Sequence, residues 1–164
     1  MAKASDLMKE NNEMEFANIL VAEDDRDDYE FMVEAFEKVS PGSTVTRSVN
    51  GLECISFLKK NEKPDVVFLD LNMSIKNGLD CLKYIKNSET LADIPVVIYS
   101  TSHYIKDIDT AFKNHAHYYI VKPASADNLA DILLRVLNSL RENLAYPRKE
   151  DFVVRLNAES ASHY

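Results

Sequence analysis

Two short apolar segments of this chain each end in acidic residues. Residues Ile19–Ala22 lead directly into Glu23 and Asp24, and Val66–Leu69 lead into Asp70. Carboxylates that lie close together repel one another, and a hard divalent cation relieves that repulsion. Mg²⁺ fits best, because it prefers oxygen ligands and usually keeps several waters beside one or two carboxylates. A single acidic residue after a strand is usually a solvated turn residue or a helix cap, so the metal interpretation depends on both segments ending at the same place.

Two further apolar segments end in a hydroxyl and in an ammonium group. Val96–Tyr99 is followed by Ser100, and Tyr118–Val121 is followed by Lys122. A phosphoryl group carries negative charge spread over its oxygens, which a metal ion, a lysine and a hydroxyl donor neutralise together. Taken alone, Ser100 would simply open a loop and Lys122 would extend into solvent. Together with the carboxylates, they predict a Mg²⁺-dependent site for phosphoryl chemistry.

These residues need a scaffold that brings the segment ends together. The apolar runs are four to six residues long, rich in Val and Ile and apolar on both faces, which is typical of strands buried in a parallel sheet. The predicted strands are Ile19–Ala22, Thr44–Val49, Val66–Leu71, Val96–Tyr99 and Tyr118–Val121. Stretches with helical spacing of apolar residues follow each of them, at 29–39, 52–58, 79–86, 105–112 and 129–140. Ser125 is the predicted N-cap of the last helix.

Strand and helix alternate five times along the chain. This alternation requires right-handed crossovers and helices on both faces of the sheet. We therefore expect an α/β fold with a doubly wound, five-stranded parallel sheet in the order 2-1-3-4-5 and five helices. In this winding the ligand site lies at the carboxyl ends of strands 1 and 3, where the order reverses. That position brings Glu23 and Asp24 next to Asp70.

Composition restricts the class of protein further. The 164 residues, 46% of them hydrophobic, suffice for one globular domain. The net charge of −8 comes from 27 acidic and 19 basic residues, which disfavours nucleic acid or an anionic membrane as a partner. No apolar run is long enough to cross a bilayer, and the amino terminus does not resemble a signal peptide. We expect a cytoplasmic protein whose two cysteines, Cys54 and Cys81, are reduced core residues.

The domain boundaries follow from the same pattern. Residues 1–15 are polar and are predicted to be a flexible leader, and residues 16–141 hold the alternating elements. The remaining residues 142–164 form a tail too short for a second domain, with no room for an output domain. Within this tail, 152–156 is apolar enough for a short strand, but loose packing or fraying is the expectation. His115 and His117 are expected to lie on the surface beside the fifth strand.

Four sequence motifs occur together in a characteristic order and spacing: ILVAEDD, VVFLDLNMSIKNG, PVVIYSTS and YIVKP. In these motifs the chain resembles the receiver domain of bacterial two-component response regulators over residues 16–141. The resemblance implies a flavodoxin-like fold and a signalling protein that is not an enzyme, in which Asp70 accepts a phosphoryl group from a histidine kinase. It implies that Glu23, Asp24, Asp70 and the backbone carbonyl of Asn72 bind Mg²⁺.

The same resemblance assigns a switch. Lys122 matches the conserved lysine of the family, Ser100 the switch hydroxyl and Tyr119 the switch aromatic residue. Phosphorylation of Asp70 would draw Ser100 toward the phosphoryl group and allow Tyr119 to turn inward, changing the face made by helix 4, strand 5 and helix 5. The alternative for Tyr119 is ordinary packing against helix 5. The family commonly has a cis peptide bond at the position of Lys122–Pro123.

The sequence also has to be weighed against two other functions, that of a phosphohydrolase and that of a scaffold. An aspartate-nucleophile phosphohydrolase also needs a carboxylate, Mg²⁺ and a lysine, but those enzymes have a second Asp two residues after the nucleophile, where this chain has Asn72. A scaffold that works without phosphorylation would not need the complete set of acidic residues together with Ser100 and Lys122.

The resemblance is strongest to small, receiver-only regulators that serve phytochromes and related sensor kinases. It implies a sensor histidine kinase, of phytochrome type, and a downstream protein as partners. Members of this group often form homodimers through the helix 4–strand 5–helix 5 face. Here Tyr104, Tyr118 and Leu134 would supply apolar contacts on that face, and the alternative for each of them is a place in the core.

Overall fold

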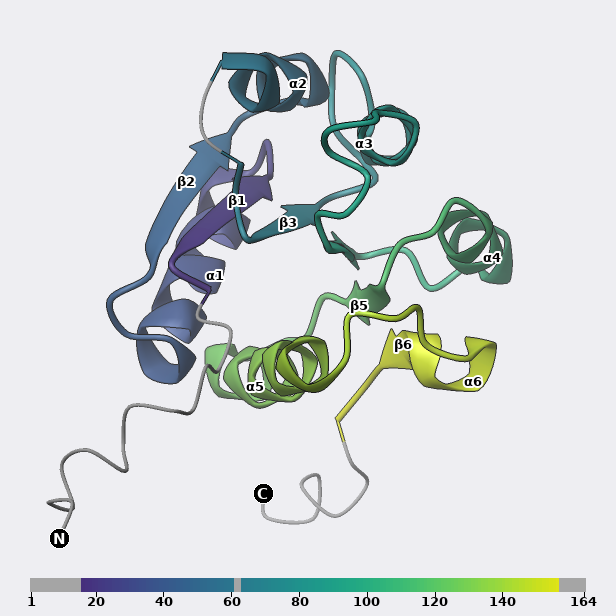
Figure 1. Cartoon of the computed structure of the whole chain (residues 1–164). Helices are drawn as coiled ribbons and strands as arrows, with labels where there is room; N and C mark the ends of the chain where they lie inside the picture. Colours follow the sequence, from purple (N-terminus) through teal and green to yellow (C-terminus); the bar gives the residue numbers. More distant parts are fainter. Residues whose placement is uncertain (1–15, 61–62, 157–164) are drawn as a thin grey trace, which may run out of the picture.

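The structure is a computed structural model that describes residues 16–60 and 63–156, so the predicted leader 1–15 lies outside the described residues. Strands and helices alternate along the chain, as the apolar pattern predicts (Figure 1). The strands are β1 (Asn18–Ala22), β2 (Thr44–Ser48), β3 (Val66–Leu69), β4 (Val96–Ser100), β5 (Tyr118–Val121) and β6 (Val153–Val154). The helices are α1 (Arg26–Val39), α2 (Gly51–Lys60), α3 (Gly78–Lys86), α4 (Ile105–Lys113), α5 (Ala126–Glu142) and α6 (Lys149–Phe152).

All the strands are parallel, in the order β2-β1-β3-β4-β5-β6. The predictions of five strands and of five helices are therefore each one too low, because the short α6 and β6 were not predicted as elements. Both elements are too short to show a hydrophobic period, which is the signal from which the other elements were predicted. Among the described residues, no helix is long and apolar enough to cross a membrane.

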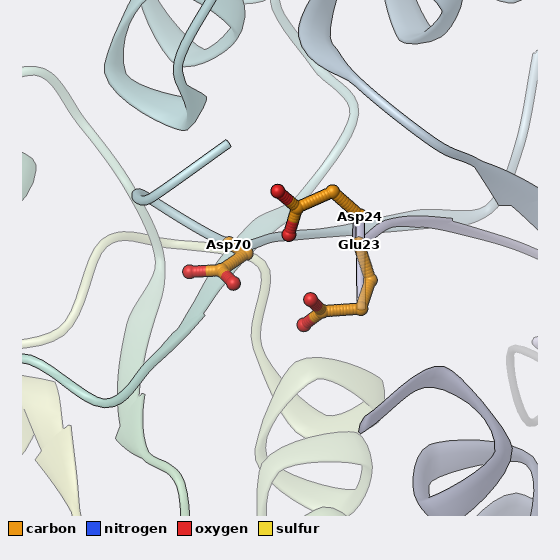
Figure 2. Close-up of side chains that lie close together, drawn as sticks. All are labelled: Glu23, Asp24 and Asp70. Atoms are coloured by element: carbon orange, nitrogen blue, oxygen red, sulfur yellow. The ribbon is translucent and has the colours of Figure 1, made fainter. Parts of the chain in front are cut away.

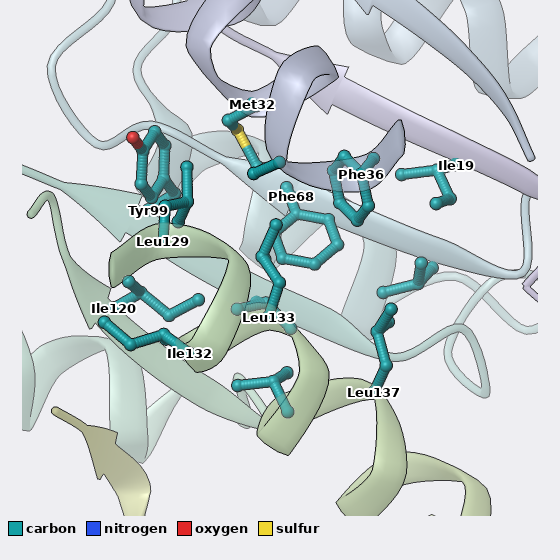
Figure 3. Close-up of a cluster of buried hydrophobic side chains, with 14 of the residues drawn as sticks. Ile19, Met32, Phe36, Phe68, Tyr99, Ile120, Leu129, Ile132, Leu133 and Leu137 are labelled. Atoms are coloured by element: carbon teal, nitrogen blue, oxygen red, sulfur yellow. The ribbon is translucent and has the colours of Figure 1, made fainter. Parts of the chain in front are cut away.

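Alternate residues of the strands point to opposite faces of the sheet and form two separate cores. Phe68 and Val97 belong to the core that α1 and α5 cover, in which Phe36 packs edge-on against Phe68 (Figure 3). Leu69 and Ile98 belong to the opposite core, beneath α2, α3 and α4. Burial on both faces explains why the central strands read as continuous apolar runs.

Polar residues fix the helix starts close to the strand ends. The Asp25 carboxylate caps α1 by accepting from the Asp28 amide at 2.9 Å. The predicted cap Ser125 accepts from the Asn128 amide at 3.1 Å, which confirms the expected start of α5. Each cap satisfies a free amide of the first turn and so stabilises the start of its helix, on the side of the sheet where the acidic residues lie.

The carboxyl-terminal segment corrects one expectation. Residues 152–156 were expected to pack loosely, but Phe152 is fully buried and the two residues of β6 pair with β5. A buried aromatic side chain supplies the apolar area that a two-residue strand lacks, and pairing satisfies backbone groups at the edge of β5. The expectation of loose packing failed because neither the burial of Phe152 nor the pairing with β5 can be recognised from the sequence of so short a segment.

His117 also departs from its expected place on the surface. Its ring is buried at the end of the sheet opposite the acidic residues, with its Nδ1 3.4 Å from the Val96 amide nitrogen and its Nε2 3.1 Å from the Leu144 carbonyl oxygen. The Tyr146 ring covers it, with a distance of 4.6 Å between ring centroids. Burial, with a smaller contribution from the nearby Lys86 ammonium, lowers the pKa of His117 to about 4.

This buried imidazole predicts a loss of stability in mild acid. Between pH 6.5 and about 4, the unfolded chain binds a proton on His117 that the folded chain does not. The free energy of unfolding therefore falls as the pH falls through this range, by roughly 2–3 kcal/mol from this group. Urea unfolding at several pH values measures the slope. His117→Gln should reduce it, and equal slopes for the variant and the parent would contradict the assignment.

Candidate functional site

Three carboxylates converge where β1 and β3 end. Ala22 lies opposite Leu69 in the paired strands, so the residues that follow them come out side by side. Glu23, Asp24 and Asp70 each offer an oxygen within 4.8 Å of the others, and Figure 2 shows the three side chains gathered at one place. Glu23 and Asp70 are buried, whereas Asp24 is exposed. The convergence predicted from the winding of the sheet is confirmed.

Lys122 reaches this cluster from the end of β5. Its Nζ lies 2.8 Å from Glu23 Oε2, 2.9 Å from Asp70 Oδ2 and 2.7 Å from Asp28 Oδ2, and its side chain is only 8% exposed. The ammonium also lies 5.2 Å from the centre of the Tyr99 ring. Burial alone would lower the pKa of Lys122, but hydrogen bonds to the three carboxylates hold it above its ordinary value. Lys122 therefore stays protonated and neutralises part of the acidic cluster.

The burial of Glu23 makes the remaining negative charge costly. Burial raises the pKa of Glu23 to about 7; the neighbouring Lys122 opposes this rise and the Asp70 carboxylate adds to it. One ammonium faces four carboxylates when Asp28 is counted, so the cluster stays negative when all of them are ionised. A set of carboxylate oxygens with excess negative charge fits a hard divalent cation, which would supply the missing positive charge.

Asp28 is a part of the site that the sequence pattern missed. It comes from the first turn of α1 instead of a strand end, and its salt bridge to Lys122 spans 94 positions of sequence. The available signal was its place in the helix that starts at the site. Acidic residues in a first helical turn are common for a different reason, because they interact favourably with the helix dipole, so this signal alone does not single out Asp28.

Arg47 of β2 is a second missed residue. Its guanidinium donates to the backbone carbonyls of Glu23, at 3.0 Å, and Asp24, at 2.8 Å. These bonds fix the backbone that carries both acidic side chains. The sequence offered no signal for this role, since the positions are far apart along the chain and Arg47 lies within a strand.

Ser100 and Tyr119 lie on neighbouring strands and are both buried. The Ser100 hydroxyl accepts from the Ser102 amide at 3.2 Å, and the Tyr119 hydroxyl donates to the Ser102 carbonyl at 2.8 Å. Tyr119 therefore points inward, and it packs in the core beneath α4, on the other face of the sheet from α5. The alternative of packing against helix 5 is wrong.

The last two predicted features concern the backbone. The Asn72 amide donates to Asp70 Oδ1 at 3.1 Å, so Asn72 lies beside the acidic cluster, and its carbonyl as a metal ligand stays a prediction. The described residues contain no cis peptide bond, so the Lys122–Pro123 bond is trans. The expectation of a cis bond at this position is wrong.

Comparison with known proteins agrees with this geometry. Residues 19–134 match the family model of the response regulator receiver domain. The probable methanogenesis regulatory protein FilR2 of Methanothrix harundinacea is 32% identical over 116 residues, which cover 68% of this chain and 75% of FilR2. Response regulator Rcp1 of Synechocystis is 26% identical over 135 residues, which cover 79% of this chain and 92% of Rcp1.

Two solved structures that are similar to this chain are also response regulators. The phosphorylated cyanobacterial phytochrome response regulator RcpA superposes with a TM-score of 0.70 at 30% identity, covering 79% of this chain and 96% of RcpA. The Mn²⁺-bound form of Rcp1 superposes with a TM-score of 0.69 at 25% identity, covering 80% of this chain and 99% of that structure. The fold is thus the flavodoxin-like receiver fold, and the chain belongs to the response regulator receiver domain family.

Proposed function

We propose that this chain accepts a phosphoryl group on Asp70 from a histidine kinase, in a Mg²⁺-dependent reaction, and passes the signal on by protein–protein contact. The observation that carries the proposal is the convergence of Glu23, Asp24 and Asp70, with the Lys122 ammonium paired to Glu23 and Asp70. Receiver domains take their phosphoryl group from histidine kinases and bind Mg²⁺ or Mn²⁺ in an acidic pocket, and a Mn²⁺-bound form of Rcp1 has been solved.

The residues of the chain have separable parts in this reaction. An oxygen of Asp70 attacks the phosphorus as the bond to the kinase's histidine nitrogen breaks, which leaves an acyl phosphate on Asp70. Lys122, already 2.9 Å from Asp70 Oδ2, balances the charge of the phosphoryl oxygens. Glu23, Asp24, Asp70 and the Asn72 carbonyl would hold Mg²⁺, which supplies further positive charge at the same oxygens.

The proposed switch uses the two buried hydroxyls beside the site. The phosphoryl group brings strong acceptor oxygens, and the Ser100 hydroxyl would turn from Ser102 toward them. Tyr119 occupies the inward position that this movement favours, next to Ser102. The surface that would change with phosphorylation, and that a partner protein would bind, is the face made by α4, β5 and α5.

The similarity to RcpA and Rcp1 supports a kinase of phytochrome type as the partner. On the switch face, Tyr104 is 68% exposed and Leu134 is 42% exposed, whereas Tyr118 is partly buried. We propose Tyr104 and Leu134 as the apolar contacts of a homodimer or of a downstream protein. Sedimentation velocity with and without a phosphoryl mimic separates the two, since an unchanged monomer contradicts the homodimer.

Incubation with acetyl phosphate tests the function directly. With Mg²⁺ present, the intact mass of the chain should rise by one phosphoryl group, because the acidic cluster then has its full counter-charge. With the metal removed by a chelator, the rate should fall by at least about 100-fold, the scale of losing one group that stabilises transition-state charge. A chain that gains no mass in either condition contradicts the proposal, and sustained hydrolysis of a phosphomonoester would instead indicate a phosphohydrolase.

Asp28→Asn tests the additional partner of Lys122. The variant keeps the side chain's shape but removes the charge 2.7 Å from Nζ, so Lys122 is held less firmly toward Asp70. Because Asp28 is 41% exposed, we expect a loss of about 1 kcal/mol, which is a roughly fivefold slower phosphorylation by acetyl phosphate. Asp27→Asn is the matched control, since Asp27 lies in the same helical turn and is exposed. Equal rates for the two variants would rule out the role of Asp28.

A further inference from the structure

The segment Lys149–Val154, named the C-terminal latch here, packs across α4 and the edge of β5 (Figure 1). The two residues of β6 pair in parallel with Tyr119 and Ile120. At the other end of the latch, Lys149 Nζ lies 2.8 Å from Asp109 Oδ1 of α4. The latch therefore occupies part of the face proposed to carry the signal.

Phe152 is the anchor of the latch. Its side chain is fully buried, and its ring lies 5.2 Å from the ring of Phe112 of α4 and 6.2 Å from that of Tyr119, measured between centroids. All three rings belong to the same apolar core or pack against it. Tyr119 is thus covered on its outer side by a residue that lies 33 positions further along the chain.

Tyr119 connects this anchor to the phosphorylation site. Its hydroxyl donates to the Ser102 carbonyl, and the Ser102 amide donates to the Ser100 hydroxyl at the end of β4. A row of contacts does not by itself couple two sites; coupling needs an element with two alternative positions that both sites influence. Tyr119 would be that element, because departure of Phe152 would remove a buried ring that lies 6.2 Å from its own and would uncover it.

We propose that docking of the C-terminal latch and phosphorylation of Asp70 stabilise each other, because both favour the inward position of Tyr119. This inference rests on the proposed function and adds a regulatory segment to it. Coupling between two binding events is reciprocal, so the latch must raise the affinity of the site for a phosphoryl group by the same factor by which phosphorylation favours docking.

Beryllofluoride, a phosphoryl mimic, measures the coupling in the full chain. With saturating Mg²⁺, titration calorimetry should show that Phe152→Ala binds the mimic at least about fivefold more weakly than the parent. Phe152→Leu, which keeps most of the apolar volume, should recover part of that affinity. Glu150→Gln is the matched control within the latch, since its exposed carboxylate pairs with exposed Arg148, and it should bind like the parent.

Hydrogen exchange of the unaltered chain gives a second measurement that needs no variant. Beryllofluoride should slow the exchange of the latch amides. If Phe152→Ala fails to fold, this exchange measurement alone decides whether the latch and the site are coupled. Equal affinities of the folded Phe152→Ala variant and the parent, or latch amides whose exchange the mimic leaves unchanged, would overturn the coupling while the proposed function stands. A parent chain that binds no beryllofluoride would overturn the proposed function, and the coupling with it.

Discussion

Asp70→Asn should abolish Mg²⁺-dependent phosphorylation of the chain. An amide oxygen is a far weaker nucleophile than a carboxylate oxygen, so no acyl phosphate forms at this position. The remaining partners are kept: the Asn72 amide still has an acceptor, and Lys122 still pairs with Glu23 and Asp28. The variant should therefore fold and lose the mass gain with acetyl phosphate completely.

The matched control for this variant is Asp25→Asn. It makes the same chemical change in an exposed residue next to the acidic pair, and Asn caps a helix about as well as Asp. Its phosphorylation should resemble that of the parent. If Asp70→Asn still gained one phosphoryl group while folded, another residue would be the acceptor, and peptide mapping would identify it.

Lys122→Met should cost both stability and phosphorylation. The ammonium is 8% exposed and is the cation shared by Glu23, Asp70 and Asp28, so its removal leaves the buried carboxylates of Glu23 and Asp70 without a cation. Breaking a buried ion pair on one side costs about 3–5 kcal/mol, which urea unfolding in the absence of metal measures. The loss should shrink when the pH is lowered, since protonation of Glu23, whose pKa burial raises, then removes part of the unpaired charge, and it should shrink when Mg²⁺ is added.

Lys38→Met is the control for Lys122→Met. Lys38 also contacts two carboxylates, those of Glu34 and Asp127, but it is 44% exposed. A solvated ion pair contributes little, so this variant should lose far less stability than Lys122→Met and phosphorylate normally. Equal losses of stability in the two variants would show that burial of the Lys122 cluster has no energetic consequence.

The parts of the site that the sequence predicted are those set by strand register. Once alternating elements indicate a parallel sheet with β1 next to β3, Glu23 and Asp70 must emerge together, because each follows the last residue of its strand. Ser100 and Lys122 follow from the same rule at β4 and β5. The family motifs then add roles that spacing alone does not.

The parts that the sequence did not predict depend on tertiary contacts of single side chains. Asp28 joins the site through one salt bridge from a helix, and His117 is buried because Tyr146 and the Leu144 carbonyl cover it from the carboxyl-terminal segment. The short β6 is stabilised by the burial of Phe152 and not by its own propensity. None of these features has a period or a local motif, which are the two signals that a single sequence provides.

The two edges of the sheet also bear on how copies of the chain behave at high concentration. Open strand edges present unpaired amides and carbonyls that can recruit further strands and so start aggregation. Here one edge is β6, only two residues long, and the other is β2, whose sequence TVTRS carries two threonines and an arginine. The long apolar strands lie between these two. A further strand could therefore pair only with the short edge at β6 or with the polar edge at β2. This protects a highly apolar sheet from growing into a fibre.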